Sequence, residues 1–121
     1  MTRVLLADDH YLFRELLARV LRQDTNFNEI VQAESLAEVR QLLRGLGGNI
    51  DLAIVDVDLS NGEGAEVIKE LRAVGVPVLA LTLGQSLQGR ARAVRAGAAE
   101  VLGTTAPGEE IIRVAKRLVD E

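Results

Sequence analysis

Four aspartates follow two apolar runs in this sequence. Asp8 and Asp9 come after the run VLLA, and Asp56 and Asp58 come after the run LAIV. If both runs are parallel strands of one sheet, their carboxyl ends lie on the same edge, where open α/β sheets bind ligands. Carboxylates gathered there repel one another unless a cation or a proton neutralises part of their charge. The four residues therefore predict an acidic functional site.

Mg²⁺ suits such a site, because it takes oxygen ligands and keeps several waters, so that one or two carboxylates are enough. We expect Asp9 and Asp56 to bind it directly, the backbone carbonyl of Asp58 to bind it as well, and Asp8 to act through a bound water. An Asp-Asp pair after a strand often only caps the following helix, so the first pair alone leaves both roles open. The second strand, which ends in Asp-x-Asp, favours the functional site.

Phosphoryl transfer fits this site, since a metal ion neutralises the developing charge while a carboxylate attacks the phosphorus in line. Asp56 is the best candidate for the nucleophile, because it closes a central strand. The turn NGEG after it leaves the carboxylate exposed, although these glycines are equally well explained as ordinary turn residues, Gly64 above all. Thr82 ends another apolar run with a hydroxyl on the same edge, within reach of a phosphoryl group on Asp56.

The rest of the chain predicts the frame for this site. Five short apolar runs alternate with helical patterns, which is typical of a parallel sheet with helices on both faces. The expected strands are 4–8, 30–33, 52–56, 77–82 and 100–103. Gly45, Gly75 and Gly97 stand where three of the helices should end.

The helix expected over 85–96 has the weakest apolar pattern. Leu87, Ala91 and Val94 form its only apolar side, and three arginines surround them. Because this helix buries little, we expect it to be the least firmly held element.

The composition narrows the class of protein. A chain of 121 residues can form one domain with a single core and is too short for two of ordinary size. The absence of cysteine excludes disulfides and thiolate metal sites. A net charge of −4 argues against tight binding of nucleic acid by this part of the protein. No signal segment or membrane-spanning run is visible, so a cytoplasmic location is expected.

The whole chain resembles the receiver domain of two-component response regulators. VLLADDHYLFRELLARVL is similar to the opening of NarL/FixJ-type (LuxR-type) regulators, in which an arginine, here Arg14, follows the Asp-Asp-His. DLAIVDVDLSNGEGAEVIKEL resembles the phosphoacceptor strand and third helix, VPVLALT the fourth strand, and RAVRAGAAEVL the run into the fifth. The resemblance implies a flavodoxin-like (βα)5 fold with a five-stranded parallel sheet in the order 2-1-3-4-5.

The resemblance also implies functional roles. Asp56 would accept a phosphoryl group from a histidine kinase with Mg²⁺, Asp8 and Asp9 would be the acidic pair, and Thr82 the switch hydroxyl. The subfamily also has histidine at the position of His10, for which we expect a structural or helix-start role instead of metal ligation. Beyond Mg²⁺-dependent self-phosphorylation and self-dephosphorylation, we expect no enzymatic activity.

Two positions depart from the family pattern in a way that bears on switching. Thr104 stands where the family has a lysine that pairs with the phosphoryl group, and Val101 replaces an aromatic residue that switches its rotamer. Both changes predict weaker coupling between phosphorylation and output. Arg90 is a minor candidate for the missing cation.

Two functions therefore stay open. In the first, phosphorylation controls dimerisation and transcriptional output through the fourth helix, fifth strand and fifth helix. For any single charged residue of that surface, a solvated face is the preferred explanation. These residues are Arg90, Arg92, Arg95, Glu110, Arg113, Lys116 and Arg117. In the second, the chain is a pseudo-receiver, an interaction module that is largely independent of phosphorylation. A nucleotide- or flavin-binding protein is disfavoured, because no glycine-rich loop follows the first strand.

We expect residues 1–121 to form a single receiver domain. It is either the N-terminal part of a longer regulator with a C-terminal helix-turn-helix domain or a single-domain regulator.

Overall fold

The computed structural model describes residues 2–59, 62–83 and 86–120. Within them, strands and helices alternate as the sequence predicts. The elements are β1 (Thr2–Ala7), α1 (Tyr11–Arg22), β2 (Phe27–Ala33), α2 (Leu36–Leu46), β3 (Leu52–Asp56), α3 (Gly64–Ala73), β4 (Val78–Thr82), α4 (Leu87–Ala96), β5 (Glu100–Gly103) and α5 (Gly108–Asp120). None of these helices combines the length and the apolar character needed to cross a membrane.

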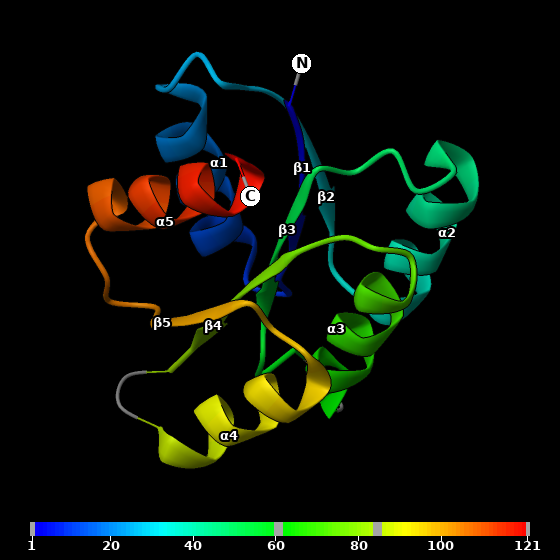
Figure 1. Cartoon of the computed structure of the whole chain (residues 1–121). Coiled ribbons are helices and arrows are strands. Elements are labelled where there is room, and N and C mark those ends of the chain that lie inside the picture. The colour runs from blue at the N-terminus through cyan, green and yellow to red at the C-terminus, as the bar shows by residue number, and fades with distance from the viewer. Residues whose placement is uncertain (1, 60–61, 84–85, 121) are drawn as a thin grey trace.

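The strands form one parallel sheet in the order β2-β1-β3-β4-β5. The expected flavodoxin-like (βα)5 fold is therefore confirmed. Figure 1 shows α1 and α5 on one face of the sheet and α2, α3 and α4 on the other. Because all strands run in the same direction, their carboxyl ends lie together at one edge.

Some element boundaries differ from the expected ones. β2 begins at Phe27 instead of residue 30, because its residues are mostly half-buried and form no continuous apolar run. α2 continues through Gly45 and ends before Gly47, which has a φ of 61° and so takes the left-handed conformation that ends many helices. The helix start expected at Gln85 lies outside the described residues. β3 and β5 have the expected bounds, whereas β1 and β4 shift by one or two residues.

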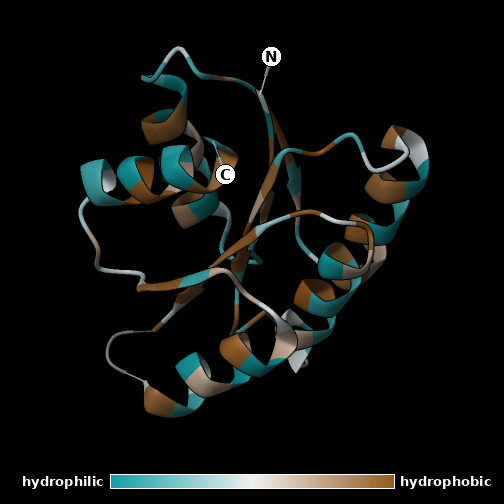
Figure 2. Cartoon of the chain, in the orientation of Figure 1, coloured by the Kyte–Doolittle hydropathy of each residue, from teal (hydrophilic) through white to brown (hydrophobic). Residues whose placement is uncertain are grey.

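The core is mostly aliphatic, with Phe27 as its one fully buried aromatic residue among the described residues, and the sheet divides it into two layers. Leu17, Leu21 and Leu118 pack on the sheet from α1 and α5. Val39 and Ile68 belong to the layer under α2, α3 and α4. Figure 2 shows hydrophobic strands in the centre and helices whose hydrophilic faces turn outward. This packing fixes β1 and β3, whose ends carry the aspartates.

α4 turns a different side to the core from the one expected. Gly89, Ala93 and Ala96 are buried, whereas Leu87 and Val94 are 80% and 60% exposed. The predicted apolar side is therefore wrong. The reason is steric, because small residues one and two turns apart let the helix backbone lie close to its neighbours. That α4 is the least firmly held element stays a prediction.

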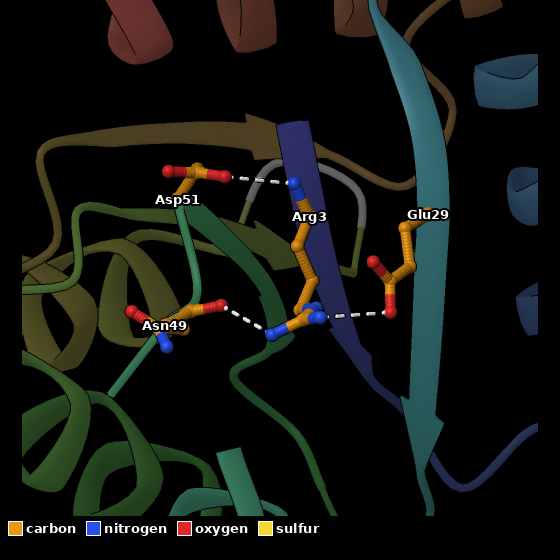
Figure 3. Close-up of a pocket in the computed structure, with 4 residues that line it drawn as sticks. All are labelled: Arg3, Glu29, Asn49 and Asp51. Atoms are coloured by element: carbon orange, nitrogen blue, oxygen red, sulfur yellow. Dashed lines mark hydrogen bonds and ion pairs between the residues drawn. The ribbon is translucent and has the colours of Figure 1, made fainter. Parts of the chain in front are cut away.

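At the opposite edge of the sheet, Arg3 of β1 ties two neighbouring segments together. Its guanidinium donates to the carbonyl of Asn49 (3.0 Å) and pairs with Glu29 of β2 (3.0 Å). Its backbone N–H donates to a carboxylate oxygen of Asp51 (2.8 Å). Figure 3 shows Arg3 between β2 and the segment that leads into β3. These contacts hold the amino ends of the strands whose carboxyl ends form the acidic edge.

Candidate functional site: an acidic pocket at the carboxyl edge of the sheet

The carboxyl edge of the sheet gathers the residues that the sequence singles out. Asp8 directly follows β1, Asp56 ends β3, Thr82 ends β4 and Thr104 directly follows β5. A pocket of about 220 Å³ opens at this edge. It is lined by Asp8, His10, Phe13, Asp56, Asp58, Leu83 and Thr104. The expected meeting of aspartates from two strands is confirmed.

Four side chains of this edge can share a metal ion. Asp8, Asp9, His10 and Asp56 each offer one donor atom, and these atoms lie within 4.8 Å of one another. Asp8 and Asp56 are only 5% and 6% exposed. Carboxylate oxygens are the donors that Mg²⁺ prefers, so the donor set fits a divalent ion of this kind. The expected roles of the Asp58 carbonyl and of a water on Asp8 stay predictions.

The pocket has a charge problem that a cation would solve. The pKa of Asp56 is raised to about 6, chiefly by burial and also by the carboxylates of Asp8, Asp58 and Asp9. The backbone N–H of Asp58 opposes this shift by donating to Asp56 Oδ1 (2.8 Å). Burial also raises the pKa of Asp8. Positive charge beside Asp56 is therefore favourable.

Asp56→Asn is expected to raise the melting temperature when no divalent ion is present. The raised pKa means that the folded state binds a proton more tightly than the unfolded state, so this carboxyl destabilises the fold as pH rises through about 4 to 6. Above this pH range, the ionised carboxyl destabilises the fold to its full extent. After a discount for solvent screening, the gain from the substitution should be about 1–2 kcal/mol at neutral pH. Scanning calorimetry measures it.

Mg²⁺ should then stabilise the unmodified protein at neutral pH and the Asp56→Asn variant much less. Asp120→Asn, at an exposed position that ends α5, is the matched control and should leave both results unchanged. An equal response to Mg²⁺ in the unmodified protein and in Asp56→Asn would contradict the placement of Asp56 in the metal site.

Arg14 of α1 fixes the loop that carries the acidic pair. Its buried guanidinium donates to the backbone carbonyl of Asp8 (2.6 Å) and to the side-chain oxygen of Gln32 on β2 (2.7 Å). It also lies 5.7 Å from the centre of the Tyr11 ring. In the sequence, Arg14 stands out only through the family resemblance. Its position one turn into the helix after the Asp-Asp-His is the signal that indicates this role.

His10 precedes α1, but its side chain makes no capping hydrogen bond to the helix. The ring turns toward the carboxylates instead, with Nδ1 3.2 Å from Asp8 Oδ1, 3.4 Å from Asp9 Oδ1 and 3.8 Å from Asp56 Oδ2. The hydrogen bond with Asp8 is the main reason why the pKa of His10 is raised. The residue therefore begins the helix through its backbone, as the N-cap of α1, while its imidazole lies in the acidic pocket.

A cation reaches the pocket rim from α4, but it is not Arg90. Arg92 donates to one carboxylate oxygen of Asp58 (2.9 Å), and the other accepts the backbone N–H of Leu83 (3.3 Å). Arg90 donates to the carbonyl of Val101 in β5 (3.3 Å), so its guanidinium is engaged away from Asp56. The pair of Arg92 and Asp58 is not predictable from the sequence, because 34 positions separate the two residues and only the fold brings them together.

Thr82 ends β4 as expected, but its hydroxyl faces α4. The residue is fully buried, and a Cβ atom added to Gly89 would lie 2.3 Å from Thr82 Oγ1. Among the described residues, Thr82 Oγ1 has no hydrogen-bond partner. The backbone carbonyl of Thr82 accepts the N–H of Thr104 (2.9 Å), which holds Thr104 at the pocket. The role of Thr82 as a switch hydroxyl stays a prediction that requires its side chain to turn toward Asp56.

The seven charged residues expected on a dimerisation surface all have contacts within the chain. Besides those of Arg90 and Arg92, the contacts are Lys116 with Asp24 (3.1 Å), Arg113 with Glu110 (3.9 Å), Arg117 with Glu100, and Arg95 with the carbonyl of Ala91 (3.4 Å). Lys116 thus lies on the side of α5 that faces the end of α1. Whether this surface forms a dimer stays a prediction.

The fold and the acidic pocket together define a receiver-type α/β protein. A family model described as the response regulator receiver domain matches residues 4–116. The chain belongs to this family.

The chain is similar to parts of several longer proteins. The DNA-binding transcriptional activator DevR/DosR of Mycobacterium tuberculosis is 31% identical over 118 residues, which cover 96% of this chain and 54% of that protein. The KDP operon transcriptional regulatory protein KdpE of Escherichia coli is 34% identical over 103 residues, with 84% and 44% covered. A protein-glutamate methylesterase/protein-glutamine glutaminase of Rhizobium johnstonii is 30% identical, and the chain covers 31% of it. The chain spans about half or less of these relatives.

Solved structures share the fold. The signal receiver domain of a DNA binding response regulator from Colwellia psychrerythraea has a TM-score of 0.86 over the full length of both chains at 18% identity. A response regulator from Burkholderia pseudomallei, solved with a phosphorylated aspartic acid, a calcium ion and citrate, has a TM-score of 0.81 at 26% identity. That match covers 99% of this chain and 69% of the other.

Proposed function

We propose that the chain takes a phosphoryl group from a histidine kinase on Asp56, with Mg²⁺ as the cofactor. The observation that carries this proposal is the buried Asp56 carboxylate at the end of β3, which lines a pocket and shares a cluster of donor atoms with Asp8 and Asp9. The relative from Burkholderia pseudomallei, solved with a phosphorylated aspartic acid and a calcium ion, supports it. Membership of the receiver family makes phosphorelay signalling the natural setting.

The geometry suggests how Asp56 reacts. The Asp58 N–H holds Asp56 Oδ1 and leaves Oδ2, the oxygen that faces His10, to attack the phosphorus. An aspartyl phosphate forms as the bond from phosphorus to the donor's nitrogen breaks. Asp8 and Asp9 would hold a Mg²⁺ ion, which would supply positive charge for the phosphoryl oxygens. Arg14 keeps Asp8 in place through its backbone carbonyl.

The finer features of this proposal come from the sequence. The Asp-Asp-His opening and Arg14 favour the NarL/FixJ (LuxR-type) subfamily, and thus a role in transcription regulation through a homodimer. Residues 1–121 then form one receiver domain, which a C-terminal helix-turn-helix domain follows in a longer protein. In this proposal the domain is cytoplasmic, binds neither nucleic acid nor membrane, and catalyses only its own phosphorylation and dephosphorylation.

A second candidate function is a pseudo-receiver whose interactions are largely independent of phosphorylation. Three observations favour it. Thr104, an uncharged residue, lines the pocket where the resemblance places a lysine. Val101 is buried in β5 at the position where the resemblance places an aromatic residue, and valine has no ring that could change its rotamer. In addition, the hydroxyl of Thr82 packs against α4 instead of the pocket.

Mass spectrometry after incubation with Mg²⁺ and acetyl phosphate separates the two functions. We expect a gain of about 80 Da, the mass of one phosphoryl group. Asp56→Asn should abolish the gain, and Asp51→Asn, which removes a carboxylate at the opposite edge of the sheet, should retain it. If neither acetyl phosphate nor a cognate kinase produces the gain, the chain is a pseudo-receiver.

A further inference from the structure

His10 adds a nitrogen donor to a cluster of carboxylates. Its Nδ1 atom lies 3.2 Å from Asp8 Oδ1, 3.4 Å from Asp9 Oδ1 and 3.8 Å from Asp56 Oδ2. The imidazole is therefore directed at the same point as all three acids. It is the only histidine of the chain, and there is no cysteine. No other soft or borderline side-chain donor competes with it apart from the single methionine.

These separations suit a shared metal ion. With metal–ligand bonds of ~2.0–2.2 Å, neighbouring donors of tetrahedral and octahedral sites lie ~3.0–3.6 Å apart. The distances from Nδ1 to Asp8 and Asp9 fall within this interval, and the distance to Asp56 is slightly longer. The His10 side chain is 70% exposed, so a small rotation of the ring would close that difference without disturbing the core.

We propose that His10 Nδ1 is a metal ligand, and that it makes this pocket favour borderline divalent ions such as Co²⁺ and Zn²⁺ over Mg²⁺. The inference rests on the metal site of the proposed function. Imidazole nitrogen binds late first-row transition ions well, whereas Mg²⁺ prefers oxygen donors and gives up its waters reluctantly. A nitrogen donor among three carboxylates therefore adds affinity for the first class of ion and little for the second.

Such a ligand also bears on the missing lysine. Thr104 leaves the pocket without a fixed ammonium group, and Arg92 is engaged by Asp58 at the rim. A divalent ion held by His10 in addition to the carboxylates would be retained more firmly beside Asp56. It would then supply the positive charge that Thr104 does not.

A competing explanation of the position of His10 predicts the opposite change in metal affinity when the histidine is removed. If His10 acts only as a positive counter-charge to the carboxylates, it competes with every metal ion for the same place. Removing it would then raise the affinity for Mg²⁺, Co²⁺ and Zn²⁺ alike. If it is a ligand, removing it weakens Co²⁺ and Zn²⁺ selectively.

The test is calorimetric titration of the untagged protein with Mg²⁺, Co²⁺ and Zn²⁺ at one neutral pH. We expect His10→Ala to weaken Co²⁺ and Zn²⁺ at least about tenfold and to change Mg²⁺ by less than about threefold. Asp9→Asn, which removes a carboxylate and keeps His10, should weaken all three ions. As a direct readout, the electron spin echo of bound Mn²⁺ should show modulation by an imidazole nitrogen, and His10→Ala should remove it.

The outcomes distinguish the role of His10 as a ligand from the existence of the metal site itself. Equal losses for all three ions in His10→Ala, or a gain in affinity, would overturn the ligand assignment while leaving the metal site intact. Metal binding that does not respond to Asp9→Asn would overturn the metal site itself, and with it both proposals. A nitrogen modulation that survives in His10→Ala would show that another group supplies the nitrogen.

Discussion

Gly64→Ala is expected to destabilise the protein by about 2 kcal/mol or more, because the added methyl group has no space. A Cβ atom at this position would lie 2.3 Å from the backbone oxygen of Val57 and 2.7 Å from that of Asp56. Both neighbours are backbone atoms, so relief requires α3 to move away from the end of β3. Urea denaturation monitored by circular dichroism measures the change in the free energy of unfolding.

The same substitution should impair the acceptor. Val57 and Asp56 belong to the segment that carries the proposed phosphoacceptor, so a displaced α3 also displaces the Asp56 carboxylate. The yield of phosphorylated protein after incubation with acetyl phosphate should fall, even at a temperature where the variant is folded.

Gly45→Ala is the matched control for this prediction. Gly45 is exposed within α2, and no atom lies within 4 Å of the place of its Cβ. Alanine favours a helix interior over glycine by about 1 kcal/mol, so this variant should gain stability. A Gly64→Ala variant as stable as the unmodified protein would show that α3 can shift freely, and the steric argument would fail.

Thr104→Lys is expected to prolong the lifetime of the phosphorylated state by on the order of tenfold, since a charge-assisted contact to the phosphoryl group replaces a neutral side chain. Thr104 lines the pocket together with Asp56, and the bond of its N–H to the carbonyl of Thr82 fixes its backbone. After removal of acetyl phosphate, the decay of the mass gain of about 80 Da gives the lifetime. The ammonium should also stabilise the protein when no divalent ion is present, because it offsets the buried carboxylates.

Thr105→Lys tests whether the added charge acts locally. Thr105 is exposed and does not line the pocket, so its lysine should leave both the lifetime and the stability near those of the unmodified protein. Equal lifetimes for Thr104→Lys and the unmodified protein would show that position 104 is not the one from which an ammonium reaches the phosphoryl group.

The sequence predicts the sheet and the place of the acids because buried parallel strands have a strong pattern. β3 and β4 are buried at every residue. A short, continuous apolar run between helical patterns is typical of a strand that is buried on both faces. Asp56 and Thr82 are the last residues of these two runs, so the pattern alone places them at the carboxyl edge of the sheet. β2 was harder to delimit, because it is an edge strand with half-buried polar residues between Phe27 and Ala33.

Contacts that depend on small residues or on long sequence separation could not be predicted. Gly89 and Ala93 are too small to stand out in an apolar pattern, so the sequence favours larger residues as the buried side of α4. Gly64 resembles an ordinary turn glycine until the backbone of β3 is seen beside it. The pair of Arg92 and Asp58 connects two segments that no local pattern relates.

The position of Tyr11 has a spectroscopic consequence. It is the only tyrosine in a chain without tryptophan, it follows His10 directly, and its ring is 62% exposed beneath the Arg14 guanidinium. The near-ultraviolet emission of the protein therefore comes almost entirely from the residue that directly follows the histidine of the acidic pocket. Paramagnetic ions that bind beside His10 are expected to quench this emission and Mg²⁺ is not, so the unlabelled chain carries its own optical probe of what occupies the pocket.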